Sequence, residues 1–217
     1  MFESKAGVLL VAGLGFFLFA FVSNGMVPVL MYRNLHEQPV SELTNANVMY
    51  QFEDLEHRFP EQFAKYIGEP TKENCAKSLE LGRHIYVGEG CWHCHSQFVR
   101  PVSNESLRFG PVSKSEEYQN ALQRPVMFGT RRVGPDLCRE GGRRSNDWHA
   151  THFYRPESVS TNSPMPEYPW FFDGEPNKPN ERGLALMIYI QWLGSWLESY
   201  PYYEEYRPVT AATKVTP

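Results

Sequence analysis

The sequence predicts an all-α protein in which a single N-terminal transmembrane helix precedes a small helical domain. Residues 6–32 contain no charged side chain, apolar residues recur at helical spacing over 49–59, and the apolar run 184–197 spans several helical turns. We expect an anchor over residues 1–34 and a linker with an amphipathic helix over 35–70. A domain over 71–200 and a C-terminal tail over 201–217 follow.

The uncharged stretch Ala6–Tyr32 would reach about 40 Å as an α-helix, enough to cross a hydrocarbon core of about 30 Å. A cleaved signal peptide is the alternative, but it would begin with basic residues and have an apolar run of only about 7–15 residues. Here Glu3 accompanies Lys5, and no small-residue cleavage site follows. We therefore expect a retained anchor. Ser23 and Asn24 interrupt it and suit a protein interior or the membrane interface equally.

The run Cys91-Trp92-His93-Cys94-His95 contains the Cys-x-x-Cys-His motif that attaches a c-type haem. One helical turn presents both thiols to one haem edge, and the imidazole of His95 becomes an axial ligand of the iron. A zinc site would need a second ligand pair, and a thioredoxin-like redox pair leaves the histidine unexplained. The motif occurs once, so we expect one covalently bound haem c.

Cytochrome c maturation takes place outside the bacterial cytoplasm, which places the domain after Tyr32 on the periplasmic side of the inner membrane. Lys5 and Arg33 nearly balance, so flanking charge does not set the orientation. The net charge of -4 argues against a nucleic-acid partner. Cys75 and Cys138 lie outside the motif, and an oxidising compartment would permit a disulfide between them. The sequence does not establish their separation, so this pairing stays open.

An electron-transfer haem needs a sixth iron ligand, and Met165 is the main candidate. It lies between two prolines that restrict the backbone, so its thioether can be held against the iron. Met127 is a weaker candidate, and Met187 has the position of a core residue. His149 and His152 are alternative ligands, although a hydrogen bond to a haem propionate or a surface position explains them more simply.

Further residues are expected around the haem without ligating it. The carbonyl of Pro135 can accept the Nδ1–H of the proximal imidazole and orient it, although an ordinary turn would explain the same residue. Arg131 and Arg132 can bind the propionates, and Trp148 belongs to an expected short helix over Ser145–Tyr154. A solvated basic face or an acidic partner would account equally for most arginines of this group, which also includes Arg100, Arg143 and Arg144.

Two longer helices are expected in the domain, over Lys72–Val87 and Leu184–Leu197, the second with Asn180 as its N-cap. The second helix is apolar on nearly all sides, which indicates burial on more than one face. We expect one stripe of it, including Trp192 or Trp196, to meet a partner protein. The alternative is that the linker or the tail folds back over it.

Taken together, these features make the chain resemble the monohaem subunit, CcoO or FixO, of cbb3-type cytochrome c oxidases. The continuation of the haem motif as Ser-Gln-x-x-Arg-Pro is more specific than the motif itself. The resemblance covers most of the chain in order and rests on the segments Gly90–Pro101, Gly129–Leu137, Gly141–Arg144, Asp147–His149 and Ser163–Trp170.

The resemblance implies a class I cytochrome c domain in which the helix Lys72–Val87 crosses the helix Leu184–Leu197. Gly82 and Tyr189 then form the close contact, with Tyr86 beside it. The resemblance also maps the axial ligands onto His95 and Met165, in agreement with the argument from the residues.

The implied function is electron transfer from a dihaem cytochrome subunit to the low-spin haem b of the catalytic haem-copper subunit. Oxygen reduction and proton pumping take place elsewhere in that proton-translocating oxidase. The alternatives are the monohaem subunit of a nitric oxide reductase, which lacks the Ser-Gln-x-x-Arg-Pro continuation, and a free-standing membrane-anchored shuttle. A haem enzyme or gas sensor with an open iron position is opposed by Met165. The motifs assign no role to residues 103–123.

Overall fold

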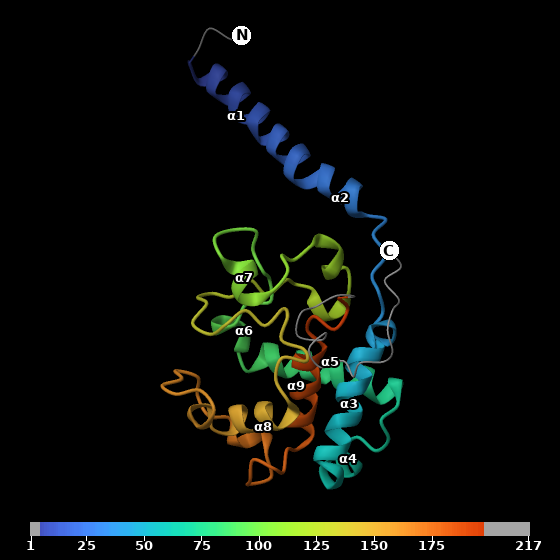
Figure 1. Cartoon of the computed structure of the whole chain (residues 1–217). Helices are drawn as coiled ribbons and strands as arrows, with labels where there is room; N and C mark the ends of the chain where they lie inside the picture. The colour runs from blue at the N-terminus through green and yellow to red at the C-terminus, as the bar shows by residue number, and fades with distance from the viewer. Residues whose placement is uncertain (1–4, 198–217) are drawn as a thin grey trace, which may run out of the picture. The chain divides into compact units, whose positions relative to one another are not determined.

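The computed structural model describes residues 5–197, so residues 1–4 and the segment 198–217, with the expected C-terminal tail, lie outside the described residues. The chain divides into two units, Met1–Glu37 and Gln38 onward, and each is described by itself. The regular elements of residues 5–197 are all helical, as Figure 1 shows. This confirms the all-α prediction.

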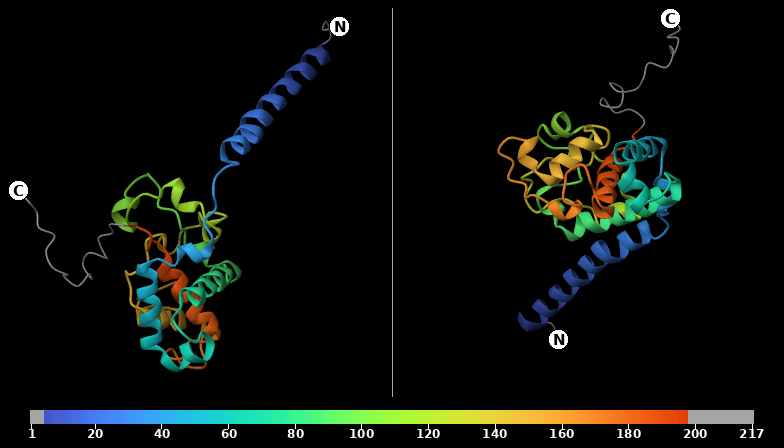
Figure 2. Two further views of the ribbon diagram at one scale, coloured as in Figure 1. Left: turned by 90° about the vertical axis from the view of Figure 1, so that its right-hand side faces the viewer. Right: turned by 90° about the horizontal axis from the view of Figure 1, so that it is seen from below.

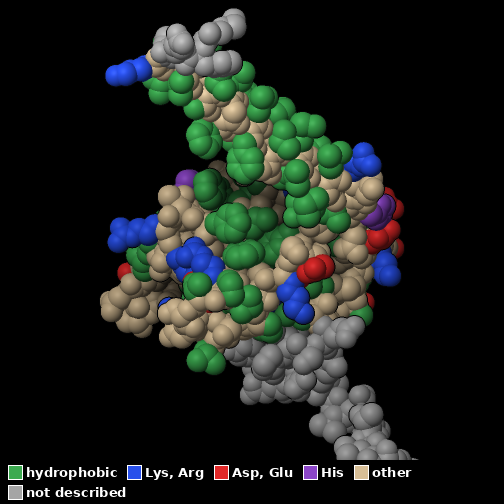
Figure 3. All heavy atoms as spheres, turned by 90° about the horizontal axis from the view of Figure 1, so that it is seen from above, with side chains coloured by type: hydrophobic (Ala, Val, Ile, Leu, Met, Phe, Trp, Pro, Cys, Tyr) green, Lys and Arg blue, Asp and Glu red, His purple; other side chains and the backbone are tan. Residues whose placement is uncertain are grey.

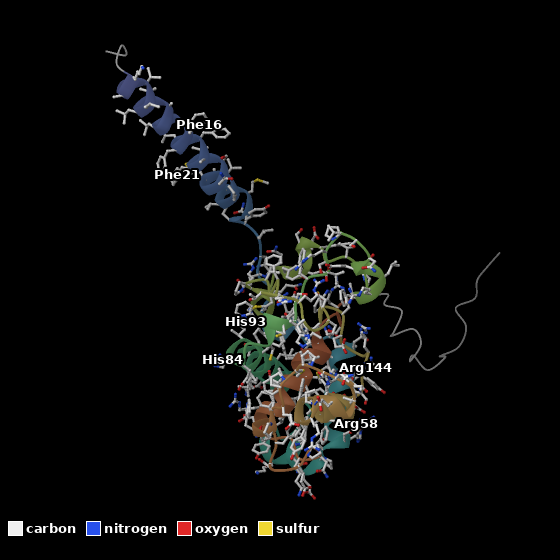
Figure 4. All side chains as sticks on the ribbon, turned by 90° about the vertical axis from the view of Figure 1, so that its left-hand side faces the viewer. Phe16, Phe21, Arg58, His84, His93 and Arg144 are labelled. Carbon is white, nitrogen blue, oxygen red and sulfur yellow. The ribbon has the colours of Figure 1, made fainter. Side chains whose placement is uncertain are left out.

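The first unit is a continuous helix made of α1 (Lys5–Phe21), a π-helical turn (Val22–Met26) and α2 (Val27–Tyr32). It is long and apolar enough to cross a membrane. Large apolar side chains such as Phe16 and Phe21 point away from the helix axis and are exposed (Figure 4). Such a helix is stable in lipid, where its backbone groups bond within the segment. The predicted N-terminal helix is confirmed as a helix that could span a membrane.

The π-helical turn has a cause in the sequence. Pro28 has no N–H, and its ring would collide with the carbonyl four residues earlier in a regular α-helix. The wider turn relieves this collision, and the N–H of Val27 bonds to the carbonyl of Val22, five residues back. The hydroxyl of Ser23 lies 3.4 Å from the carbonyl oxygen of Ala20, so this polar group has an acceptor inside the helix.

The second unit is built from seven α-helices within the described residues. Polar side chains cap four of them: Asn45, Thr71, Ser145 and Asn180 accept backbone N–H groups at the starts of α3, α5, α8 and α9. The expected helices near residues 72–87 and 145–154 and the Asn180 cap are confirmed. The helices are α3 (Ala46–Arg58), α4 (Pro60–Tyr66), α5 (Lys72–Gly88), α6 (Cys91–Cys94), α7 (Glu105–Phe109), α8 (Asn146–Tyr154) and α9 (Glu181–Trp192).

The crossing of α5 and α9 is the centre of this unit. A Cβ atom on Gly82 would lie 2.1 Å from the carbonyl oxygen of Ala185 and 2.6 Å from the Cβ of Tyr189. Only glycine permits so close an approach of two backbones. The rings of Tyr86 and Tyr189 meet beside it with centroids 5.5 Å apart. The expected close contact of Gly82 with Tyr189 is confirmed.

The outer side of α9 is covered by the chain itself. Every residue from Gly183 to Trp192 is buried. The covering helices are α3 and α4, which lie alongside α9 in both views of Figure 2. Val48, Phe52 and Leu55 of α3 are fully buried. The expectation that a stripe of α9 meets a partner protein was therefore wrong, because the amphipathic helix of the expected linker supplies the apolar cover.

The last helix also ends earlier than expected, at Trp192 instead of Leu197. Gly194 has a φ of +89°, which breaks the helical path. A Cβ on Gly194 would lie 3.0 Å from the Cα of Arg139. The carbonyl of Leu193 accepts the N–H of Gly141 at 2.8 Å. The residues after α9 therefore pack against the loop around residue 140 instead of continuing the helix.

Cys75 and Cys138 are both free and buried, which answers the question about a disulfide. Cys75 lies on α5 in the main core. Cys138 belongs to a separate small cluster with Val99, Phe109 and Tyr118. The two thiols therefore lie in different parts of the unit, and the sulfur of Cys138 also accepts a hydrogen bond from the guanidinium of Arg139 at 3.2 Å.

Candidate haem site

The attachment motif lies on α6, a single helical turn. Gly90 precedes it with a φ of +72°, a left-handed conformation that lets the chain turn sharply after α5. The spacing of three residues puts Cys91 and Cys94 on one side of this turn. Both sulfur-bearing residues line the same cavity. The sequence thus folds locally into the arrangement that two attachments to one ligand edge require.

A loop holds α6 through its last carbonyl groups. The carbonyl of His93 accepts the N–H groups of Thr130 and Arg131, at 3.2 and 3.1 Å. The carbonyl of Cys94 accepts those of Val133 and Gly134, both at 3.1 Å. The carbonyls that a short helix leaves unpaired are therefore bonded to the segment that follows Gly129.

The imidazole of His95 is oriented by the same loop. Its Nδ1 lies 2.9 Å from the carbonyl oxygen of Pro135, so the hydrogen bond expected from the sequence is present. A Cβ on Gly134 would lie 2.3 Å from the Cε1 of this ring. Burial lowers the pKa of His95, while the bond to Pro135 raises it. The result is a neutral imidazole whose Nε2 is left for a metal.

A cavity of about 460 Å³ opens beside this imidazole, a size within the usual range for ligand and cofactor sites. Met165, on the loop between α8 and α9, lines it together with His95 and the two cysteines. Of the residues expected around the haem, Pro135 and Trp148 line it, whereas Arg131 and Arg132 do not. The structure also puts six other notable side chains in the lining: Glu140, Arg143, Arg144, His149, His152 and Tyr168.

The alternative sulfur ligand lies elsewhere. Met127 is buried in the main core and does not line the cavity. Met187 is fully buried on α9, as expected for a core residue. Among the described methionines, Met165 is therefore the one that shares a cavity with His95.

Arg132 forms a polar network behind the motif instead of lining the cavity. Its guanidinium pairs with Glu105 at 2.7 Å and donates to the hydroxyl of Ser96 at 2.6 Å. The buried Asp136 accepts bonds from that hydroxyl at 2.5 Å and from the N–H of Phe98 at 2.9 Å. Arg131 is exposed. The network fixes the segment after His95 to the loop that orients the imidazole.

The cationic end of the cavity is formed by Arg143 and Arg144. The guanidinium of Arg144 lies over the Trp148 ring, 5.1 Å from its centre. Figure 4 shows Arg144 on one side of the unit with Arg58, and His93 on the other with His84. Anionic groups of a ligand bound between these sides would meet two guanidinium groups.

Two buried titratable side chains, Glu140 and His149, and the half-buried His152 shape the electrostatics of the cavity. Burial raises the pKa of Glu140 to about 7, although Arg143 and Arg144 oppose this shift. Burial lowers the pKa of His149 to about 3 and that of His152 to about 4. The histidines are therefore neutral at pH 7, and His149 Nε2 and His152 Nδ1 have no hydrogen-bond partner among the described residues.

Gly134, Glu140 and Tyr168 were not predicted as site residues. The sequence contains a feature that could have identified Gly134, because this residue stands in a Gly-Pro turn about forty residues after the haem motif. No feature of the sequence identifies Glu140 or Tyr168, since their position in the cavity follows from the packing of loops.

These residues fit a c-type haem. Two thiols, an oriented imidazole and a thioether surround one cavity, and the absent Cβ of Gly134 leaves room for the imidazole ring. A family model described as "Cytochrome C oxidase, mono-heme subunit/FixO" matches residues 59–196.

The chain belongs to the FixO family. FixO proteins are mono-haem subunits of a cytochrome c oxidase, so the chain is part of an oxidoreductase complex and its family implies a haem. Together with the apolar helix of the first unit, membership indicates a membrane-anchored FixO protein. A search of curated proteins found no match. The FixO match begins at Phe59, after α3.

Proposed function

We propose that this chain relays electrons through one covalently attached haem c in a cbb3-type oxidase. The electrons would arrive from a dihaem cytochrome subunit and leave to the haem b of the catalytic haem-copper subunit of this proton-translocating complex. The haem unit would lie on the periplasmic side of the inner membrane. The observation that carries the proposal is the shared cavity of Cys91, Cys94, His95 and Met165.

In this proposal the chain's own residues hold and orient the cofactor. Cys91 and Cys94 would form the thioether links, and before attachment burial raises the pKa of the Cys91 thiol to about 12. His95 and Met165 would hold the iron, and Pro135 orients the imidazole through the 2.9 Å bond. When bound, a haem c with these ligands supplies a one-electron iron couple of raised potential.

The cavity lining would also fix the direction in which the cofactor lies. Arg143 and Arg144 would bind the propionates through charge-assisted bonds, and Trp148 would support them through its ring. In this proposal, Arg143 and Arg144 take the role expected of Arg131, which is exposed, and of Arg132, which is bonded to Glu105 and Asp136.

The test uses the complete chain purified in its membrane complex and compares two volume-conserving variants. Met165→Leu should keep the covalent haem, lose the six-coordinate spectrum and lower the midpoint potential, because a thioether ligand raises it. Met127→Leu is the matched control and should resemble the wild type in spectrum and potential. An unchanged spectrum in Met165→Leu would remove this residue as a ligand.

The burial of α9 favours neither the oxidase subunit nor a free-standing shuttle, because the apolar faces of this helix are covered within the chain. Membership of the oxidase family favours the subunit. Copurification of the wild-type chain with a haem b protein tests this directly, and a chain that purifies alone from mild detergent would contradict it.

A further inference from the structure

The segment 98–133 has a surface that the haem site does not explain. It contains six Lys and Arg residues against three Glu, whereas the whole chain has a net charge of -4. Five of these six cations are exposed, but only one of the three carboxylates is. Glu105 is bonded to Arg132, and Glu117 to Arg139. Two of the three carboxylates of this segment therefore form ion pairs within the unit, whereas most of its positively charged side chains are exposed to solvent.

Large apolar side chains are exposed on the same segment. Leu107 on α7 is 89% exposed, beside the exposed Arg108. Figure 3 views the end of the unit that carries α7 and shows Lys and Arg side chains set among hydrophobic ones. Exposed apolar side chains that gather in this way mark interaction surfaces. The arginine-apolar face consists of Val102, Leu107, Arg108, Phe128, Arg131 and Val133.

Contacts inside the unit connect this face to the cavity. Arg132 lies over the ring of Phe109 on α7, 5.1 Å from its centre, and it pairs with Glu105 on the same helix. Its neighbour Val133 is half exposed and also lines the cavity. Val133 donates its N–H to the carbonyl of Cys94, which is itself exposed. These contacts hold residues 131–133 beside α7, and Val133 lies at the mouth of the cavity.

We propose that the arginine-apolar face docks a carboxylate-bearing surface of the catalytic haem b subunit of the same oxidase. This inference rests on the proposed function, because it takes the partner from the oxidase complex. Exposed arginines select carboxylates, which they bind in a bidentate geometry. Apolar and arginine side chains are typical of the centre of a protein interface. A partner seated there would lie against the mouth of the cavity, where Cys94 and Val133 are exposed.

The experiment uses the full chain, tagged and purified in mild detergent with its complex. The double variant Leu107→Ser with Arg108→Glu changes two exposed side chains, so the fold should persist. We expect the haem b retained on the tagged chain at raised salt to fall about tenfold, because reversed charge now faces the partner's carboxylates. Covalent haem c and its spectrum should stay as in the wild type.

Two controls define the effect. Lys72→Glu reverses an exposed charge at the start of α5, outside the face, and should retain haem b as the wild type does. Arg108→Lys keeps the charge and should retain most of the binding. Equal retention by the double variant and Lys72→Glu would overturn the proposal.

Binding to anionic vesicles separates a membrane surface from a protein partner. The probe is a set of phosphatidylglycerol–phosphatidylcholine vesicles incubated with the purified complex. Loss of vesicle binding in the double variant with unchanged haem b retention would overturn the proposal and assign the face to lipid headgroups. A wild-type chain that purifies without any haem b would instead defeat the proposed function itself.

Discussion

Two glycines allow close approach in two different regions of the second unit. Gly82 at the crossing of α5 and α9 faces backbone, the carbonyl of Ala185. Gly134 beside the cavity faces the movable end of a side chain, the imidazole of His95. The crossing depends on close packing of apolar surface, whereas the cavity wall depends on hydrogen bonds between loops. The first region determines whether the unit folds, and the second determines how a ligand is held.

This difference predicts where substitutions affect stability and where they affect the cofactor. A Cβ at the crossing has no space unless α5 and α9 separate. Because both helices pack in the core, their separation would disturb that packing. A change in the cavity wall can be absorbed by rotation of a side chain or by a loop. We therefore expect stability effects to decrease, and spectroscopic effects to increase, from the crossing toward the cavity.

The largest effect is expected for Gly82→Ala. The added Cβ would lie 2.1 Å from the Ala185 carbonyl, so α5 and α9 must separate. Overpacking costs about 1–3 kcal/mol in ordinary cores, and we expect a loss near or above the upper end here. Gly88→Ala on the same helix is the control, because no atom lies within 4 Å of its Cβ position. Denaturant unfolding should show a large loss only for the first variant.

The next effect is a pH dependence of stability through Glu140. Burial raises the pKa of Glu140 from 4.5 to about 7, so between these values the folded state holds a proton that the unfolded chain has released. The free energy of unfolding therefore falls as pH rises through this window, by at most about 3 kcal/mol, and then levels off. Glu140→Gln should remove this slope and be more stable than the wild type at pH 8. Denaturant midpoints at pH 5 and 8 measure it, and parallel curves would contradict the prediction.

A smaller loss, about 2 kcal/mol, is expected for Asp136→Asn. The carboxylate accepts bonds from Ser96, from the N–H of Phe98 and from the N–H of Cys138. An amide offers a single acceptor oxygen, so at least one buried donor loses its partner. Asp147→Asn is the control, since this side chain is exposed and its ion pair among the described residues is with Arg58, at the surface. Similar unfolding curves for both variants would show that the network adds little.

The smallest stability effect, about 1 kcal/mol, is expected for Gly134→Ala, together with the largest spectroscopic effect of these four substitutions. The new Cβ displaces the imidazole of His95, which can rotate but then loses its bond to Pro135. The haem c spectrum and midpoint potential should change. Pro135→Ala keeps the backbone carbonyl and should leave both nearly unchanged. A wild-type spectrum in Gly134→Ala would mean that the loop yields instead of the ring.

Most of the helical framework could be predicted from the sequence because its signals are local. The uncharged run identified the anchor, and Asn180 identified the start of α9. The hydrogen bond from His95 to Pro135 followed from the chemistry of a metal-bound imidazole. Gly82 with Tyr189 came from the family resemblance, because the sequence alone does not give the angle at which two helices cross.

The remaining features depend on contacts between distant parts of the chain. The sequence showed that α9 is apolar on all sides, but not that α3 covers it, since the pattern is the same for an internal and an external partner. Arg132 could not be distinguished from Arg143 by type. Their surroundings differ: Arg132 pairs with Glu105 and Asp136 behind the motif, whereas Arg143 pairs with Glu140 and lines the cavity.

The covering of α9 by α3 has a consequence for the minimal folding unit. The family match starts at Phe59, one residue after α3 ends, so sequence similarity and structural independence have different boundaries. A protein cut at residue 59 would keep the whole attachment motif and its cavity. It would also lose the buried Val48, Phe52 and Leu55, and leave apolar residues of α9 in water. Any soluble version of the haem unit should therefore begin near Gln38.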